Sequence, residues 1–271
     1  MKDQLTKNLK RLHQRLQDGV LLTGINCAFN HPGIFEVACN AGHDFVGVDA
    51  EHAAINLETM ENLIRAADCH GVPCLVKLKE GTEVEIRNAL DAGASGVMVP
   101  HVLSGEGLSA AVDATYFAPR GRRGVCSAAR VNAHSSWDIR DLISWTNELV
   151  LLIPIIEDKE AVENIDEILA VDDRIQLYEI GPVDLALSLG LDLDRSITNP
   201  SPELVEALDL VTRKLREAGK KLLYPTRYPN SPLSVEEQRE ALAKRGVAAV
   251  YGMDTHCLVN AFRGFRALSG S

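Results

Sequence analysis

Eight short apolar runs alternate along this chain with segments of helical periodicity, and this alternation constrains the fold more than any other feature. Glycines stand where several of the helical segments should end. Strands that are separated by helices form parallel crossovers, because the chain must return to the same end of the sheet. The predicted strands are residues 20–25, 44–49, 74–78, 96–99, 150–156, 176–180, 221–225 and 248–253.

Eight such units within 271 residues predict one closed (β/α)8 barrel, an α/β fold of the TIM-barrel type, as a single domain over residues 1–271. Residues 1–18 are predicted to form an additional amphipathic helix. An open doubly wound sheet is the alternative, but no G-x-G-x-x-G follows the first predicted strand. Residues 120–147 are expected to be a long connection, rich in Arg and Ser, that serves as a lid or a subunit contact.

Composition limits the partners of the protein. A formal charge of −10 opposes binding to nucleic acid or to an anionic membrane, because such a surface repels polyanions. Residues 1–18 lack the apolar core of a signal peptide, and no stretch is long enough to span a bilayer, so a cytoplasmic location is expected. The six cysteines include no C-x-x-C pair, which indicates core residues or incidental thiols rather than disulfides.

Acidic residues and one histidine follow three of the predicted strands. Asp49, Glu51 and His52 come directly after the second strand, and Glu157 and Asp184 follow the fifth and sixth. In a (β/α)8 barrel the carboxyl ends of all strands meet on one face, so these side chains are expected to meet there. The structural alternative is that His52 is a solvated loop residue and Glu51 a charge at a helix start.

Two carboxylates beside an imidazole predict a metal site with a base. Glu157 and Asp184 would supply hard oxygen ligands and leave room in the coordination shell for water and a 2-keto acid. The ion would act as a Lewis acid and stabilise the enolate that forms when a C3 proton leaves. His52 is the expected base, and Asp49 is positioned in the sequence to orient its imidazole.

Several motifs in this chain resemble those of the metal-dependent HpcH/HpaI aldolase (citrate lyase-like) family. They occur in family order from about residue 20 to residue 265. The motifs are Asp49-x-Glu51-His52, Pro119-x-Gly121-x-Arg123-Gly124, Glu157-Asp158 with Glu163-Asn164-Ile165, Ile180-Gly181-Pro182-x-Asp184-Leu185, and Gly252-x-Asp254-Thr255.

The resemblance implies a class II aldolase that cleaves or forms a hydroxy-2-keto acid through a metal-bound pyruvate enolate. It implies Mg²⁺, Mn²⁺ or Co²⁺ as the metal, a 2-keto acid and an aldehyde as the small-molecule substrates, and a homotrimer or homohexamer with an exchanged C-terminal helix. By position, Glu157 and Asp184 match the metal ligands, and His52 with Asp49 matches the base. The backbone around Gly181, Pro182 and Val183 would receive the pyruvate carboxylate.

One departure from the family pattern concerns the end of the third strand, where relatives carry Arg and this chain carries Lys77. A lysine keeps the positive charge but loses the planar fork of a guanidinium, so its contact with the keto oxygen would change. Lys77 is expected to be catalytic, either as this charge or, alternatively, as a Schiff-base nucleophile. Arg123 is expected to bind an acidic part of the substrate, although it could equally be a solvated loop residue.

Two other functions remain open from the sequence. Relatives of this family include enzymes that condense oxaloacetate with an acetyl donor, and enzymes that decarboxylate oxaloacetate before joining it to another molecule. The chain could therefore be a biosynthetic condensing enzyme that resembles a citrate synthase. It could also be a non-catalytic member of the fold that binds a keto acid without forming an enolate.

Overall fold

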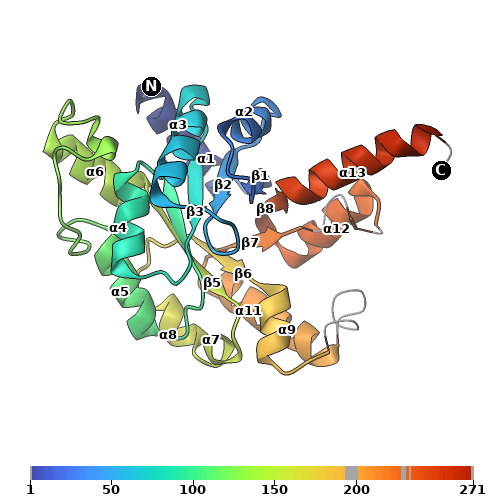
Figure 1. The fold of residues 1–271 in the computed structure, drawn as a ribbon. Coiled ribbons are helices and arrows are strands. Elements are labelled where there is room, and N and C mark those ends of the chain that lie inside the picture. Colours follow the sequence, from blue (N-terminus) through green and yellow to red (C-terminus); the bar gives the residue numbers. More distant parts are fainter. Residues whose placement is uncertain (1, 193–200, 227–229, 232, 270–271) are drawn as a thin grey trace.

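Eight parallel strands close into a barrel in their sequence order in the computed structural model, which describes residues 2–192, 201–226, 230–231 and 233–269. The strands lie at the centre of the molecule with helices around them (Figure 1). This arrangement confirms the predicted (β/α)8 barrel. The strands are β1 (Leu22–Cys27), β2 (Phe45–Asp49), β3 (Cys74–Lys77), β4 (Gly96–Val99), β5 (Leu151–Ile156), β6 (Leu177–Ile180), β7 (Lys221–Pro225) and β8 (Val247–Met253).

Helices connect the strands and begin and end at residues suited to those positions. Thr82 and Ser234 form capping boxes with the glutamates three residues later. Within the described residues, none of the helices combines the length and apolar character needed to cross a bilayer. The helices are α1 (Lys2–Gln17), α2 (Pro32–Asn40), α3 (Leu57–His70), α4 (Glu83–Asp91), α5 (Gly105–Thr115), α6 (Ile139–Leu149), α7 (Lys159–Glu163), α8 (Ile165–Leu169), α9 (Pro182–Ser188), α11 (Pro202–Glu217), α12 (Val235–Arg245) and α13 (Asp254–Arg266), with 3₁₀ turns η1 (Arg130–Asn132) and η2 (Ala267–Ser269).

The interior of the barrel is an apolar core of its own, separate from the layer between strands and helices. Leu22, Phe45 and Leu75 fill it near the start of their strands. Leu12 and Leu16 of α1 join the same cluster, so the N-terminal helix closes the amino end of the barrel. Polar side chains inside the barrel can therefore gather only at its carboxyl end, which is where (β/α)8 barrels carry their active sites.

The connection after the fourth strand differs from the expectation of a long irregular segment. Residues 139–149 form helix α6. Asp138, the residue before the helix, caps it, because its side chain accepts a hydrogen bond from the backbone N–H of Arg140. Leu142, Trp145 and Leu149 are buried on one face of α6, with the spacing of three and four residues that an amphipathic helix requires. Arg140, Ser144 and Asn147 give this helix a composition that is also typical of loops, so the sequence does not distinguish the two.

The last helix extends away from the barrel and does not complete the ring of helices (Figure 1). Its apolar side chains are exposed, with Val259 at 44%, Phe262 at 68% and Phe265 at 76%. A helix with exposed aromatic side chains needs a partner surface to bury them. Exchange of α13 between subunits stays a prediction, and these exposed apolar side chains are consistent with it.

Candidate active site

Asp49 and Lys77 end two neighbouring strands and face each other in the last register pair between β2 and β3. Both residues are buried. The Asp49 carboxylate accepts a hydrogen bond from the backbone N–H of His52, with 3.0 Å between Oδ1 and N. Asp49 therefore fixes the turn that carries His52, and its contact is with the backbone rather than with the imidazole.

Glu51 lies between Lys77, the predicted cation, and His52, the predicted base. Its Oε2 lies 2.6 Å from Nζ of Lys77 and 3.3 Å from Nε2 of His52. The side chains of Lys77 and Glu51 are only 10% and 11% exposed, whereas the imidazole of His52 is 64% exposed. Glu51 thus holds an accessible imidazole at the edge of a buried ion pair, a position from which His52 can exchange protons with a bound substrate.

The ammonium of Lys77 is surrounded by carboxylates. Burial alone would lower the pKa of Lys77, but the negative charges of Glu179, Glu51 and Glu157 outweigh it and raise the pKa above its ordinary value. Lys77 is consequently protonated at neutral pH. This protonation opposes its use as a Schiff-base nucleophile, which requires a neutral amine, and favours its use as a fixed positive charge.

Glu157 follows β5 and is nearly completely buried. Its Oε1 accepts a hydrogen bond of 3.0 Å from the backbone N–H of His101. A Cβ atom at Gly181 would lie 2.5 Å from Glu157 Oε2, so only glycine lets the carboxylate approach the start of α9 this closely. Burial raises the pKa of Glu157, and the nearby charges of Lys77 and His101 act in the opposite direction. A second cation at this point would relieve that cost of burial.

His101 adopts a left-handed backbone conformation, with φ of 50°, in the loop after β4. Its Nδ1 lies 2.9 Å from Oδ2 of Asp158, and this hydrogen bond raises the pKa of His101. A non-glycine residue with positive φ is uncommon and costs conformational energy. The strained backbone at His101 places its N–H within hydrogen-bond distance of Glu157 and its imidazole beside Asp158.

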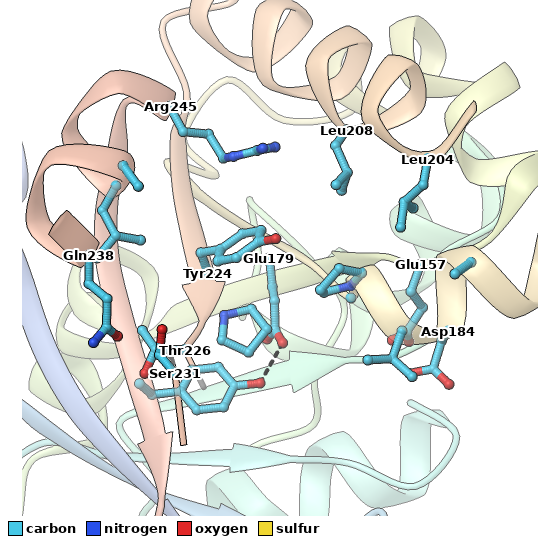
Figure 2. Close-up of a pocket in the computed structure, with 18 of the residues that line it drawn as sticks. Glu157, Glu179, Asp184, Leu204, Leu208, Tyr224, Thr226, Ser231, Gln238 and Arg245 are labelled. Carbon is cyan, nitrogen blue, oxygen red and sulfur yellow. Dashed lines mark hydrogen bonds between the residues drawn. The ribbon is translucent and has the colours of Figure 1, made fainter. Parts of the chain in front are cut away.

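Three side chains at this end of the barrel bring possible ligand atoms close enough for one metal ion. Glu51, His101 and Glu157 each offer an atom, and these atoms lie within 4.8 Å of one another. Asp184 lines the same cavity as Glu157, and Figure 2 shows the two carboxylates on the same side of it. The carboxylate oxygens suit a divalent cation, and the imidazole could complete the set.

The predicted substrate-binding residues divide into two groups. Gly181, Pro182 and Val183 line the cavity together with Lys77 and the acidic residues. Arg123 does not join them.

The guanidinium of Arg123 is buried against other parts of the chain. Its Nη2 lies 2.6 Å from Oδ1 of Asp91, at the end of α4, and its Cζ lies 4.9 Å from the centre of the Phe117 ring. Within this chain Arg123 therefore acts as a structural ion pair, and its proposed contact with an acidic substrate has no support from its position.

Glu179 and Tyr251 line the same cavity and were not predicted. The Tyr251 hydroxyl donates a hydrogen bond of 2.6 Å to Glu179 Oε1 (Figure 2). Burial raises the pKa of Glu179 to about 7, against the opposing charge of Lys77. The alternation in β6 could have revealed this residue, because Leu177, two residues earlier, belongs to the barrel interior.

The sequence profile of the HpcH/HpaI aldolase/citrate lyase family matches residues 23–261, which is nearly the whole barrel. The chain belongs to this family. The family resemblance predicted from the motifs is therefore confirmed, and membership identifies the protein as a carbon–carbon lyase.

One relative and one solved structure are similar to this chain over most of its length. The 2-keto-3-deoxy-L-rhamnonate aldolase of Escherichia coli strain K12 is 29% identical over 208 residues, which cover 76% of this chain and 75% of the relative. The solved structure of citrate synthase SbnG is 28% identical, with a TM-score of 0.80 over 95% of this chain and 96% of the other.

A third similar structure is an HpcH/HpaI aldolase/citrate lyase family protein from Burkholderia cenocepacia J2315. It is 25% identical, with a TM-score of 0.84 over 96% of this chain and 99% of the other.

Proposed function

We propose that this protein is a divalent metal-dependent aldolase that cleaves a hydroxy-2-keto acid to pyruvate and an aldehyde, or forms it in the reverse direction. The observation that carries the proposal is the meeting of Lys77, Glu157 and Asp184 in one cavity, together with the contacts of Glu51 with both Lys77 and His52. Enolate chemistry next to a carbonyl needs positive charge, ligand oxygens and a base, and these residues offer all three.

Glu157 and Asp184 would hold the ion, and Glu51 and His101 are near enough to Glu157 to assist. An oxygen-rich donor set with one imidazole suits Mg²⁺, Mn²⁺ or Co²⁺. The bound ion would act as a Lewis acid toward the keto oxygen of the substrate.

The protein residues supply the remaining steps. His52 would take the proton from C3 of pyruvate in the condensation direction, and Glu51 would stabilise the imidazolium that results. Lys77 would place its ammonium near the oxygen that becomes negative. The N–H groups of Val183 and Asp184, in the first turn of α9, would bind the substrate carboxylate, because the first N–H groups of a helix have no partner within it.

Turnover of a small set of keto acids tests this proposal. Pyruvate release from 2-keto-3-deoxy-L-rhamnonate and from shorter 4-hydroxy-2-keto acids would be followed by coupling to lactate dehydrogenase. We expect release that requires Mg²⁺, Mn²⁺ or Co²⁺ and stops on addition of EDTA. Release that persists in EDTA, or no release from any of these substrates with any of the three metals, would contradict the proposal.

A condensing reaction is the second candidate, and the similarity to citrate synthase SbnG favours it. Such an enzyme would use oxaloacetate or a related keto acid and the same ligand set. Incubation with oxaloacetate and an acetyl thioester distinguishes the two candidates, because condensation followed by hydrolysis of the thioester gives citrate and a free thiol only when oxaloacetate is present, and cleavage of a hydroxy-keto acid gives neither.

The exposed apolar side of α13 supports a homo-oligomer in which this helix packs on a neighbouring subunit. A homotrimer or homohexamer is the assembly that we propose. Phe262, Phe265 and Leu268 would form the contact, since each is more than two-thirds exposed in the single chain.

A further inference from the structure

Glu179 is a buried carboxylate of the cavity that has no assigned part in metal binding. It lies on β6, in register with Ile155 of β5 and Leu223 of β7, and it lines the same cavity as Glu157. The residue is almost completely buried. A carboxylate at this depth is unfavourable unless its oxygens find hydrogen-bond partners or a counterion.

The two oxygens of Glu179 have different surroundings. Oε1 accepts the hydrogen bond of 2.6 Å from the Tyr251 hydroxyl, which is the dashed line in Figure 2. Oε2 is buried and, among the residues that the structure describes, accepts no hydrogen bond. Buried polar atoms in folded proteins nearly always have a partner. An unsatisfied oxygen on a residue that lines a cavity therefore indicates a ligand that donates a hydrogen bond to it.

Tyr251 determines which oxygen of Glu179 stays free. Burial raises the pKa of the Tyr251 hydroxyl well above its ordinary value, and the charge of Glu179 adds to this effect. The hydroxyl therefore remains a hydrogen-bond donor and keeps Oε1 occupied. Oε2 is the oxygen that is left to meet a ligand.

Lys77 and Glu179 are close enough for each to alter the protonation of the other. Burial raises the pKa of Glu179 to about 7, and the charge of Lys77 is the strongest influence in the opposite direction. Burial would lower the pKa of Lys77, and the charge of Glu179 is the strongest of those that raise it instead. The carboxyl group of Glu179 therefore accompanies the ammonium that would stabilise negative charge on the substrate.

The reacting part of the proposed substrate offers one matching donor. In a 4-hydroxy-2-keto acid, the carboxylate at C1 and the keto oxygen at C2 only accept hydrogen bonds, whereas the C4 hydroxyl donates one. Cleavage of the bond between C3 and C4 requires this hydroxyl to lose its proton while the aldehyde carbonyl forms. A free carboxylate oxygen is suited to take that proton, and a pKa of about 7 lets Glu179 act in both directions of the reaction.

We propose that Glu179 is the general base for the C4 hydroxyl and that Tyr251 holds it in position. In cleavage, the hydroxyl proton moves to Oε2 of Glu179, the C4–O bond becomes the carbonyl of the aldehyde, and the electron pair of the C3–C4 bond passes to the enolate. Protonated His52 then gives a proton to C3, which yields pyruvate, and the proton on Glu179 returns to solvent. In condensation, protonated Glu179 gives its proton to the aldehyde oxygen. This role depends on the proposed aldolase function and adds to it the group that carries the second proton.

Two reactions of the metal-loaded enzyme separate this role from enolate formation. Exchange of pyruvate methyl protons in deuterated water requires the enolate but no C4 hydroxyl, whereas cleavage of a 4-hydroxy-2-keto acid requires both. Glu179→Gln should lower kcat for cleavage about 100-fold, the usual contribution of a positioned base, and should lower the ratio of cleavage to exchange at least about 10-fold. An unchanged ratio in Glu179→Gln, whether both rates fall together or neither falls, would overturn the proposal.

Two tyrosine variants test the positioning of Glu179. Tyr251→Phe removes the hydroxyl that donates to Glu179 and should lower the ratio about 10-fold, through kcat rather than KM, because Tyr251 acts through Glu179. Tyr178→Phe is the control, since it removes a buried hydroxyl one residue earlier on β6 that lies outside the cavity lining and, within the described residues, has no hydrogen-bond partner. Tyr178→Phe should keep the wild-type ratio. A wild-type ratio in Tyr251→Phe, or an equal fall in both variants, would contradict positioning by Tyr251.

Failure of this role and failure of the proposed function give different results. Cleavage and exchange in the wild type, with an unchanged ratio in Glu179→Gln, overturn the role of Glu179 alone. The absence of both reactions in the metal-loaded wild type overturns the role and the proposed function together. Glu163→Gln makes the same chemical change at an exposed position on α7 and should keep both wild-type rates.

Discussion

Lys77 and Glu51 form an ion pair at the mouth of the barrel, with 2.6 Å between Nζ and Oε2 and both side chains almost buried. The pair links the end of β3 to the turn after β2 and also anchors the imidazole of His52. A lysine at this position therefore does more than keep the charge that relatives supply with arginine. Lys77 is also the counterion of the Glu51 carboxylate, whose burial would otherwise destabilise the folded protein.

The first prediction concerns the loss of this charge. Lys77→Met should lower the free energy of unfolding by about 3 kcal/mol, at the low end of the range for breaking a buried pair, because Glu51 keeps some contact with water. Lys77→Arg should retain most of the stability. Urea unfolding of the three proteins in EDTA measures the effect, and equal midpoints for wild type and Lys77→Met would contradict the structural role of the pair.

The second prediction concerns the metal ligands. Glu157→Gln and Asp184→Asn should each weaken binding of Mn²⁺ at least 10-fold, because each replaces an anionic oxygen donor by a neutral amide. Glu163→Gln, which changes an exposed carboxylate on α7, is the control and should bind as the wild type does. Isothermal titration calorimetry measures the affinities. Wild-type affinity in both ligand variants would mean that the ion is held elsewhere.

The third prediction is a pH dependence of stability that arises from Glu179. Its pKa is about 7 in the folded protein, against an ordinary value of 4.5, because burial disfavours the charged form. The folded state therefore holds this proton more tightly than the unfolded state does. The resulting stabilisation is complete below about pH 4.5 and is lost as the pH rises through about 7.

Glu179→Gln lacks this proton equilibrium. Its stability relative to the wild type should therefore increase as the pH is raised from about 5 to about 8. Urea unfolding of both proteins across this range, in EDTA, is the measurement. A difference that stays constant with pH would show that the carboxyl group of Glu179 is not perturbed by burial.

The fourth prediction concerns α13. Phe262→Asp combined with Phe265→Asp should reduce the molar mass in solution from an oligomer to a smaller species, because charges would occupy an apolar contact. Multi-angle light scattering after size-exclusion chromatography measures the mass. Arg263→Asp, on the same helix, tests whether a charge change alone has this effect. An unchanged mass in the double variant would contradict a contact through α13.

The fold was predictable because its signal repeats along the whole chain. Each strand is a short run of buried residues bounded by turn residues, and the eight predicted strands match the observed ones to within about two residues. Helices with atypical composition were not predictable in this way. Residues 161–170 have the pattern of one helix, for example, but the structure divides this segment at Asn164 between α7 and α8.

The candidate site was predictable only where topology alone brings residues together. The ends of parallel strands must converge, so Lys77, Glu157 and the start of α9 could be placed on one face from the sequence. Arg123 could not be placed, because its position depends on the packing of a loop against Asp91. Glu179 and Tyr251 were missed because each looks like one more member of a buried strand until the inward face of that strand is known.

Exchange of the methyl protons of pyruvate in deuterated water, followed by NMR, tests the central claim most directly, since it reports enolate formation at this site without an aldehyde. We predict exchange that requires a divalent metal and that slows about 100-fold or more in His52→Ala, the usual contribution of a positioned base. His70→Ala, an exposed histidine at the end of α3, should exchange as the wild type does. No exchange in the metal-loaded wild type, or an unchanged rate in His52→Ala, would contradict the account.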